Sequence, residues 1–311
     1  MDDDIDYRYI DPKGNEEAGV GSGVSRDVYS SFWLEVADSY LIGEKERVPL
    51  VRHDLYKEEW SAIGKIIVKG YADTSYFPTV LSKGFLHYCL FNELNDELLL
   101  SSFKMYLADD DKNIVEKVLM PDAAASDFIS DDLLDLLDTF KCRSAVSKNN
   151  IYNIILEIAR QELIQKPHLM ASCWKTSLEY LKTNYKFTDS TKLNEIYEEL
   201  QPDRKKVISL FKPSKMNDSE KESFGYLKRY IKGLEVLHLK RLLKFLTGSD
   251  LIIVQYIDVT FTKDQSEFTR RPIAHTCGPL LELPATYNNF CELRQEFSNI
   301  LNESSWEMNI V

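Results

Sequence analysis

The chain has 311 residues, of which 44% are hydrophobic, 28% are charged and 12% are aromatic. This composition is typical of a soluble globular protein with a substantial core, and it argues against a disordered chain. The formal net charge is −12. It lies mainly in residues 1–221, which hold 39 acidic and 28 basic residues, whereas residues 222–311 hold 11 and 10. An acidic surface repels phosphate groups, so we expect no nucleic acid or membrane partner.

The cysteine pattern indicates a reducing compartment. The five cysteines are an odd number without a CxxC pair, which argues against disulfides and structural zinc. The start, MDDDIDYRYID, is acidic and does not resemble a signal peptide. The sequence contains no apolar run of the roughly 18 residues that a membrane span requires. We therefore expect a cytoplasmic or nuclear protein.

Most of the first two thirds of the chain is predicted to be helical. Ser25 is a plausible N-cap for a helix that carries Val28, Phe32 and Val36 on one face. Apolar residues at helical spacing predict further helices over residues 60–71, 81–90, 133–140 and 150–165.

The last third changes character. Residues 212–221 are polar, contain a proline and lack periodicity, so they are the best linker candidate. Residues 224–245 predict one or two basic helices, with Gly248 as a left-handed C-cap. Residues 251–261 are rich in β-branched and aromatic residues and predict a strand, and residues 288–301 predict a final helix. The fold class is therefore α+β.

The segment RPIAHTCGPLLELP, residues 271–284, resembles the active-site segment of HECT-type ubiquitin ligases, in which a proline precedes His-Thr-Cys and a Leu-Pro pair follows. Upstream, LKFLTGS at residues 243–249 is similar to the family's Leu-x-Phe-x-Thr-Gly-Ser/Thr segment. GSGVSRDVY at residues 21–29 and IGKII at residues 63–67 are similar to segments of the family's N-terminal lobe. The chain therefore resembles a divergent HECT catalytic domain along most of its length.

The resemblance implies a two-lobed architecture and a transferase activity. A large, mostly helical N-terminal lobe (residues 1–216) would dock a ubiquitin-conjugating enzyme. A small α+β C-terminal lobe (residues 217–311) would carry the catalytic Cys277, and a flexible hinge near residues 212–221 would join the lobes. Ubiquitin would form a thioester with Cys277 and then pass to a lysine of a protein substrate. No cofactor or metal is implied.

The residues around the cysteine suit such a role. A thiolate is both a strong nucleophile and a good leaving group, so exchange of one thioester for another needs no metal. Pro272, Gly278 and Pro279 favour turns and predict an exposed loop for Cys277. The family usually has Phe-Asn after the cysteine, where this chain has Gly278-Pro279. Near the C-terminus the family has a Phe where this chain has Met308, for which we expect a supporting role in the tail.

Two neighbours of the cysteine are expected to support the loop. His275 lies two residues before Cys277, so in extended backbone both side chains point the same way and a base role is possible. We favour the alternative that His275 hydrogen-bonds to the backbone and shapes the loop, while Thr276 faces the other side and packs or bonds locally. The other cysteines lie in apolar helical patterns and are expected to be core thiols: Cys89, Cys142, Cys173 and Cys291.

Two other functions stay open. A catalytically weak relative would bind ubiquitin or a conjugating enzyme as an interaction module, which the departures at Gly278-Pro279 and Met308 motivate. A cysteine hydrolase would use Cys277 with a distant histidine and would cleave ubiquitin chains. In the family, substrate selection usually belongs to segments upstream of the catalytic domain, so we expect either one domain of a longer protein or a domain that acts alone.

Overall fold

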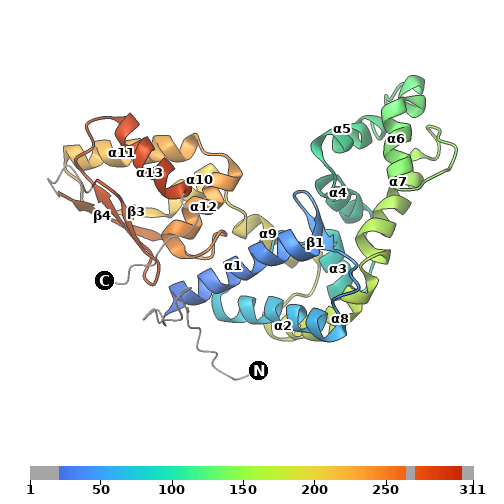
Figure 1. The fold of residues 1–311 in the computed structure, drawn as a ribbon, viewed down its shortest axis with the longest axis horizontal. Helices are drawn as coiled ribbons and strands as arrows, with labels where there is room; N and C mark the ends of the chain where they lie inside the picture. The colour runs from blue at the N-terminus through green and yellow to red at the C-terminus, as the bar shows by residue number, and fades with distance from the viewer. Residues whose placement is uncertain (1–20, 264–269, 303–311) are drawn as a thin grey trace. The chain divides into compact units, whose positions relative to one another are not determined.

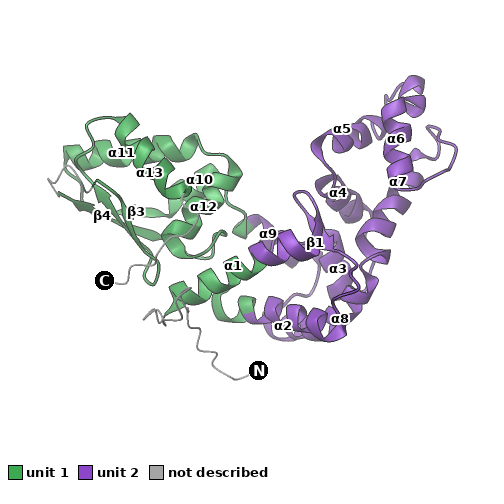
Figure 2. Ribbon diagram, viewed as in Figure 1, with its two compact units in different colours: residues 1–33, 70–76, 199–311 green, residues 34–69, 77–198 purple. Residues whose placement is uncertain are grey.

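A computed structural model describes residues 21–263 and 270–302 (Figure 1). The fold is α+β and mainly helical, as predicted. The chain divides into two compact units (Figure 2). Unit 1 comprises residues 1–33, 70–76 and 199–311, and unit 2 comprises residues 34–69 and 77–198. Three helices contribute residues to both units: α1 (Ser22–Tyr40), α2 (Lys57–Thr74) and α9 (Ser190–Leu200).

In its described residues, unit 1 contains a four-stranded sheet and four further helices. These elements are α10 (Arg204–Leu210), β3 (Phe211–Pro213), α11 (Asp218–Lys232), α12 (Val236–Thr247), β4 (Ile257–Thr262), β5 (Ile273–His275), β6 (Leu280–Pro284) and α13 (Phe290–Asn302). The strand order is β3-β4-β6-β5. β3 and β6 run parallel to β4, and β5 pairs antiparallel with β6, so β5 and β6 form a hairpin.

The core of unit 1 lies between the sheet and its helices. α11 and α13 pack side by side, and α11 also contacts β6 (Figure 1). β4 shows the alternation of a half-buried strand, with Ile257 and Val259 buried and Asp258 and Thr260 exposed. Apolar side chains from helices and strands meet in one cluster, which includes Leu227, Leu242, Leu281, Leu293 and Phe297. Each such side chain stabilises the fold by about 1.5–3 kcal/mol through its burial. This core anchors both strands of the β5–β6 hairpin.

Unit 2 is helical apart from a two-stranded hairpin. Its elements are β1 (Leu41–Gly43), β2 (Arg47–Pro49), α3 (Lys83–Phe91), α4 (Asp96–Tyr106), α5 (Asp109–Val118), the 3-10 helix η1 (Ala125–Ile129), α6 (Asp131–Thr139), α7 (Ile151–Arg160), the π-helix η2 (Gln161–Gln165) and α8 (His168–Tyr185). α3 packs on α8, where the ring of Phe85 meets Trp174 edge-on. The indole N–H of Trp174 also donates to the carbonyl of Trp60 in α2 at 2.8 Å. The predicted helices over residues 60–71, 81–90 and 133–140 are confirmed as α2, α3 and α6, with small shifts in their ends.

Two predicted boundaries are wrong. The first helix begins at Ser22, so Ser25 lies inside α1 and is not its N-cap; the Gly21 carbonyl accepts from the N–H groups of Val24 and Ser25. Of the strand expected over residues 251–261, only residues 257–261 form a strand, as part of β4. The N–H of Ile252 donates to the Leu200 carbonyl in place of a strand partner. A run of β-branched residues indicates burial as readily as it indicates strand pairing.

The predicted linker contains regular structure at both ends. β3 hydrogen-bonds to β4, and the Ser214 N–H donates to the Val259 carbonyl at 3.1 Å. Asn217 caps α11, with a reciprocal bond from its own N–H to Glu220. Within residues 212–221, only 214–217 lie outside a strand or helix. The two lobes expected at residues 1–216 and 217–311 stay a prediction, as does the hinge between them.

Candidate active site

Cys277 lies in the turn of residues 276–279 that connects β5 to β6, and its side chain is exposed. The register pairs His275 with Leu280 on the two sides of the turn, so the hairpin fixes the base of the cysteine turn. Exposure of Cys277 in a loop is what the flanking Pro272, Gly278 and Pro279 predicted. Such exposure leaves the thiol accessible to solvent.

The other cysteines are less uniformly buried than expected. Cys89 is buried, and burial raises the pKa of its thiol well above the ordinary value. Cys142 and Cys173 are half-buried. The prediction of a core thiol is wrong for Cys291, which is exposed in the first turn of α13. Helical spacing alone did not tell which side of this first turn faces the core.

The N-terminal end of α1 lies against the cysteine turn. Ser22 Oγ donates to the Cys277 carbonyl at 3.2 Å. A Cβ placed on Gly23 would lie 2.6 Å from Thr276 Oγ1 and 2.9 Å from the Cys277 nitrogen, so only glycine allows this approach. A Cβ on Gly21 would lie 3.3 Å from Cys277 Sγ. The first turn of α1 is therefore a wall of the candidate site.

Arg26 connects the cysteine turn to the end of α12. Its Nε donates to the Thr247 carbonyl at 2.7 Å, its Nη2 donates to the Thr276 carbonyl, and its Nη1 donates to Ser22 Oγ at 3.2 Å. The residue is only 8% exposed. Burial lowers the pKa of the Arg26 guanidinium, and the neighbouring Cys277 opposes this shift. Among the described residues, no carboxylate pairs with Arg26.

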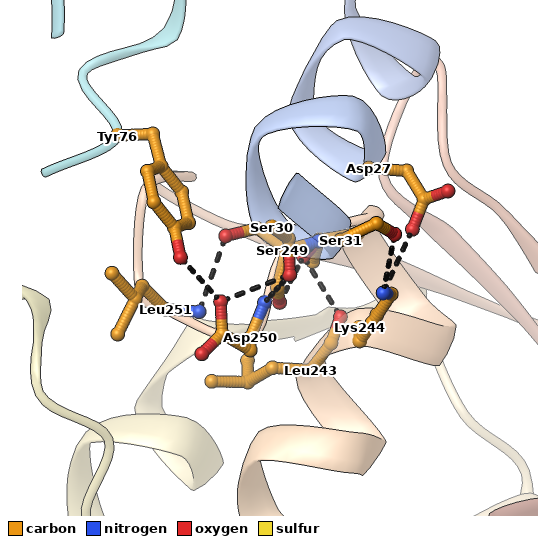
Figure 3. Close-up of polar contacts among 10 residues, drawn as sticks. Asp27, Ser30, Ser31, Tyr76, Leu243, Lys244, Ser249, Asp250 and Leu251 are labelled. Atoms are coloured by element: carbon orange, nitrogen blue, oxygen red, sulfur yellow. Dashed lines mark hydrogen bonds and ion pairs between the residues drawn. The ribbon is translucent and has the colours of Figure 1, made fainter. Parts of the chain in front are cut away.

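A buried carboxylate holds α1 to the segment that follows α12 (Figure 3). Asp250 is 6% exposed and accepts at Oδ1 from Ser30 Oγ at 2.9 Å and from the Tyr76 hydroxyl at 3.0 Å. Its own N–H donates to Ser30 Oγ, and Lys240 Nζ lies 3.8 Å from Oδ2. Because buried polar groups are costly without partners, this network fixes the relative position of the three segments that it joins within unit 1.

The end of α12 reinforces that contact. Gly248 is the left-handed C-cap that the sequence predicted, with φ +80. A Cβ there would lie 2.6 Å from the Gly23 carbonyl, so the close approach as well as the backbone angle requires glycine. Lys244 Nζ donates to Ser31 Oγ at 2.8 Å and lies 3.4 Å from Asp27 Oδ1 (Figure 3).

His275 has a carboxylate partner. Its Nε2 lies 2.8 Å from Glu282 Oε1 across the β5–β6 hairpin, and both side chains are half-buried. In the described part of the chain, no hydrogen bond connects the His275 ring to Cys277. The geometry therefore favours the loop-shaping role, although the partner is a side chain and the role of His275 stays a prediction. Thr276 contributes its carbonyl to Arg26 and its Oγ1 to the contact with Gly23. Met308 lies outside the described residues.

The contributions of Arg26 and Asp250 to the site could not be predicted from the sequence. Arg26 lies 250 positions from Thr276, and Asp250 lies 220 positions from Ser30, so no local periodicity relates them. The one available signal was the pair of glycines, Gly21 and Gly23, which permits close backbone approach.

No family model and no curated protein matches this chain. The described residues form no group of three or more His, Cys, Asp or Glu side chains able to hold a metal ion. Within the same residues, no helix has the length and apolar character needed to cross a membrane.

Proposed function

We propose that this chain is a HECT-like ubiquitin-protein ligase that carries ubiquitin as a thioester on Cys277. The observation that carries the proposal is the exposed thiol in the turn between β5 and β6, held from behind by the first turn of α1. The resemblance of residues 271–284 to the family's active-site segment supplies the substrate class.

The proposed chemistry consists of two acyl transfers. The Cys277 thiolate attacks the thioester carbonyl of ubiquitin on a conjugating enzyme, forming a C–S bond while the enzyme's cysteine leaves as a thiolate. A substrate lysine amine then attacks the new thioester, forms the isopeptide C–N bond and loses a proton, and Cys277 leaves as the thiolate. The first step exchanges one thioester for another, so it needs no oxidant, metal or cofactor.

The larger architecture belongs to the same proposal. Residues 1–216 would form the lobe that docks the conjugating enzyme, and residues 217–311 would form the lobe that presents Cys277. The thiol must face first the donor and then the substrate lysine. A movement of the second lobe would provide both positions.

The test is a loading assay with ubiquitin, activating enzyme, a panel of conjugating enzymes and ATP. Wild type should form an adduct that thiols cleave, and Cys277→Ala should form none. Cys277→Ser should form an adduct that resists thiols, because an oxyester has the poorer leaving group. Cys291→Ala is the matched control, since it removes the other exposed cysteine and should load normally. An undiminished adduct in Cys277→Ala would overturn the proposal.

A weak relative that only binds ubiquitin or a conjugating enzyme is the second candidate. It is motivated by the departure from the family's pattern at Gly278-Pro279, in the exposed turn where a Cβ on Gly278 would find nothing within 4 Å. Such a module should bind ubiquitin or a conjugating enzyme equally well as wild type and as Cys277→Ala, without a thiol-sensitive adduct in either protein. Isothermal titration calorimetry beside the loading assay separates the two functions.

A further inference from the structure

The Arg26 guanidinium is buried without a partner of opposite charge among the described residues. Burial of a cation costs free energy unless hydrogen bonds and charges compensate it. Here two backbone carbonyls and one hydroxyl supply the hydrogen bonds: Thr247 O at 2.7 Å, Thr276 O, and Ser22 Oγ at 3.2 Å. A neutral side chain at this position would avoid the free-energy cost of burying a cation. A role for the positive charge itself would explain why arginine occupies the position.

Two of the three contacts lead to the cysteine turn, one directly through Thr276 and one through Ser22. The carbonyl of Thr276 belongs to the peptide bond that leads directly into Cys277, and Ser22 donates in turn to the carbonyl of Cys277. The planar fork of arginine can bond to two carbonyls at once and hold both in fixed directions, which a lysine ammonium on a flexible stem does less well. Arg26 therefore ties the main chain before Cys277 to α1 directly, and its bond to Ser22 supports the contact with the Cys277 carbonyl.

We propose that Arg26 is a positioning residue for Cys277, which fixes the main chain of the cysteine turn and places a permanent positive charge beside the thiol. This inference rests on the proposed function for the identity of the acyl group, but not for the charge or the contacts themselves. A positive charge close to the sulfur attracts anionic reagents and anionic intermediates that form there.

The charge can be measured without ubiquitin. A thiolate displaces iodide from iodoacetate and from iodoacetamide by the same reaction, in which an S–C bond forms and iodide leaves. Only iodoacetate carries a negative charge. The ratio of its rate to that of iodoacetamide at one cysteine therefore reports the local electrostatic potential, while effects of access and thiol reactivity act on both reagents. Peptide mass spectrometry gives this ratio separately for Cys277 and for the exposed Cys291.

Arg26→Gln should lower the ratio at Cys277 by about threefold, as expected for loss of one unit charge several ångströms away in a solvated site. The ratio at Cys291 should not change. Arg26→Lys should keep the ratio, because the charge stays, but should change the rates of both reagents equally, because the fork is lost. Arg204→Gln is the matched control: Arg204 also donates to a backbone carbonyl, Leu234 O at 2.8 Å, and has no contact with the cysteine turn among the described residues.

Two measurements keep the test informative if Arg26→Gln folds poorly. The buried Cys89 should stay unmodified in every variant that folds. In wild type, added salt should lower the ratio at Cys277, because ions screen the attraction of iodoacetate to the charge. An equal ratio at Cys277 in wild type and folded Arg26→Gln, or no salt dependence in wild type, would overturn the inference.

The outcome is separable from that of the proposed function. If the ratio depends on Arg26 but Cys277 never accepts ubiquitin, the positioning role stands and the ligase proposal fails. If Cys277 loads, Arg26→Gln should lower the loading rate at saturating conjugating enzyme by tenfold or more. The enzyme concentration at half-maximal rate should not change, because the affected group acts at the thiol and not in docking.

Discussion

The hydroxyl of Tyr76 donates a hydrogen bond to Asp250 Oδ1 at 3.0 Å, although 174 positions separate the two residues. Burial, together with the Asp250 carboxylate, raises the pKa of Tyr76 well above its ordinary value, so the phenol stays protonated and remains a donor. Because Asp250 also accepts from Ser30 of α1, this pair helps to hold the wall of the cysteine site.

Tyr76→Phe should therefore destabilise the protein by about 1–2 kcal/mol, because one hydrogen bond to a buried carboxylate is lost. Urea denaturation measures the change. Tyr226→Phe is the control, since its hydroxyl bonds to Glu222 at an exposed position, and its effect should stay within about 0.5 kcal/mol. Equal effects of the two variants would show that the buried pair contributes nothing beyond a surface pair.

The close approach of α1 to the cysteine turn predicts a position-dependent effect of alanine. Gly23→Ala would bring a Cβ within 3.0 Å of the Thr276–Cys277 main chain, which must shift. We expect a loss of stability of about 1–3 kcal/mol, as in other overpacked sites, and an altered alkylation rate at Cys277. Gly225→Ala in α11 is the matched control, because nothing lies within 4 Å of its Cβ and alanine should stabilise the helix by about 1 kcal/mol. A gain in stability in both variants would refute the close contact.

How far the sequence predicts this fold depends on whether the signal is local. Trp60, Ile63 and Ile67 predict α2, because helical spacing can be recognised within a short stretch of sequence. Gly248 predicts a cap, because its conformation depends on the local backbone. Exposure of Cys277 also follows from the turn formers beside it. The contacts of Arg26 could not be predicted, because they depend on how α1 packs against residues more than 200 positions away.

The pairing of His275 with Glu282 predicts a modest effect of losing the imidazole. If His275 only shapes the hairpin, His275→Ala should slow ubiquitin loading less than about tenfold, whereas loss of a general base typically costs a factor of about 10²–10⁴. Glu282→Gln keeps the size of the partner and should have a similar, small effect. A much larger loss in His275→Ala than in Glu282→Gln would assign the imidazole a direct role at the thiol.

The buried carboxyl of Glu46 predicts a pH-dependent stability term. Burial raises the pKa of Glu46, and bonds from Ser102 and the Lys83 N–H only partly oppose the shift. A raised folded-state pKa means that the folded protein favours the protonated carboxyl. The stability that depends on this proton is fully present below the unfolded-state pKa, about 4.3, and is lost as the pH rises through the folded-state pKa. Glu46→Gln does not lose stability in this way, because an amide does not ionise. The stability of the variant relative to wild type should therefore increase from pH 4 to pH 7 in urea denaturation, and a constant difference would contradict the prediction.

A hinge can be tested at the short segment before α11, which is the irregular part of the predicted linker. Asn217 is the N-cap of α11 and has extended backbone, with φ −78 and ψ −175. Asp218 is the first helical residue, a position that tolerates proline, and proline favours extended backbone in the residue before it. Asp218→Pro should therefore stiffen this junction while unfolding stability stays within about 0.5 kcal/mol of wild type.

Asn217→Gly is the opposite change, because glycine loosens the same junction and costs only a few tenths of a kcal/mol as an N-cap. If the C-terminal lobe must move to present Cys277 to both donor and acceptor, Asp218→Pro should slow discharge of the loaded thioester to free lysine, and Asn217→Gly should not. Melting temperatures of both variants show whether the fold is intact. Equal discharge rates in the two variants and wild type would show that residues 214–217 are not the hinge. The movement would then have to use another segment or be absent, because β3 and α11 already hold the chain on either side.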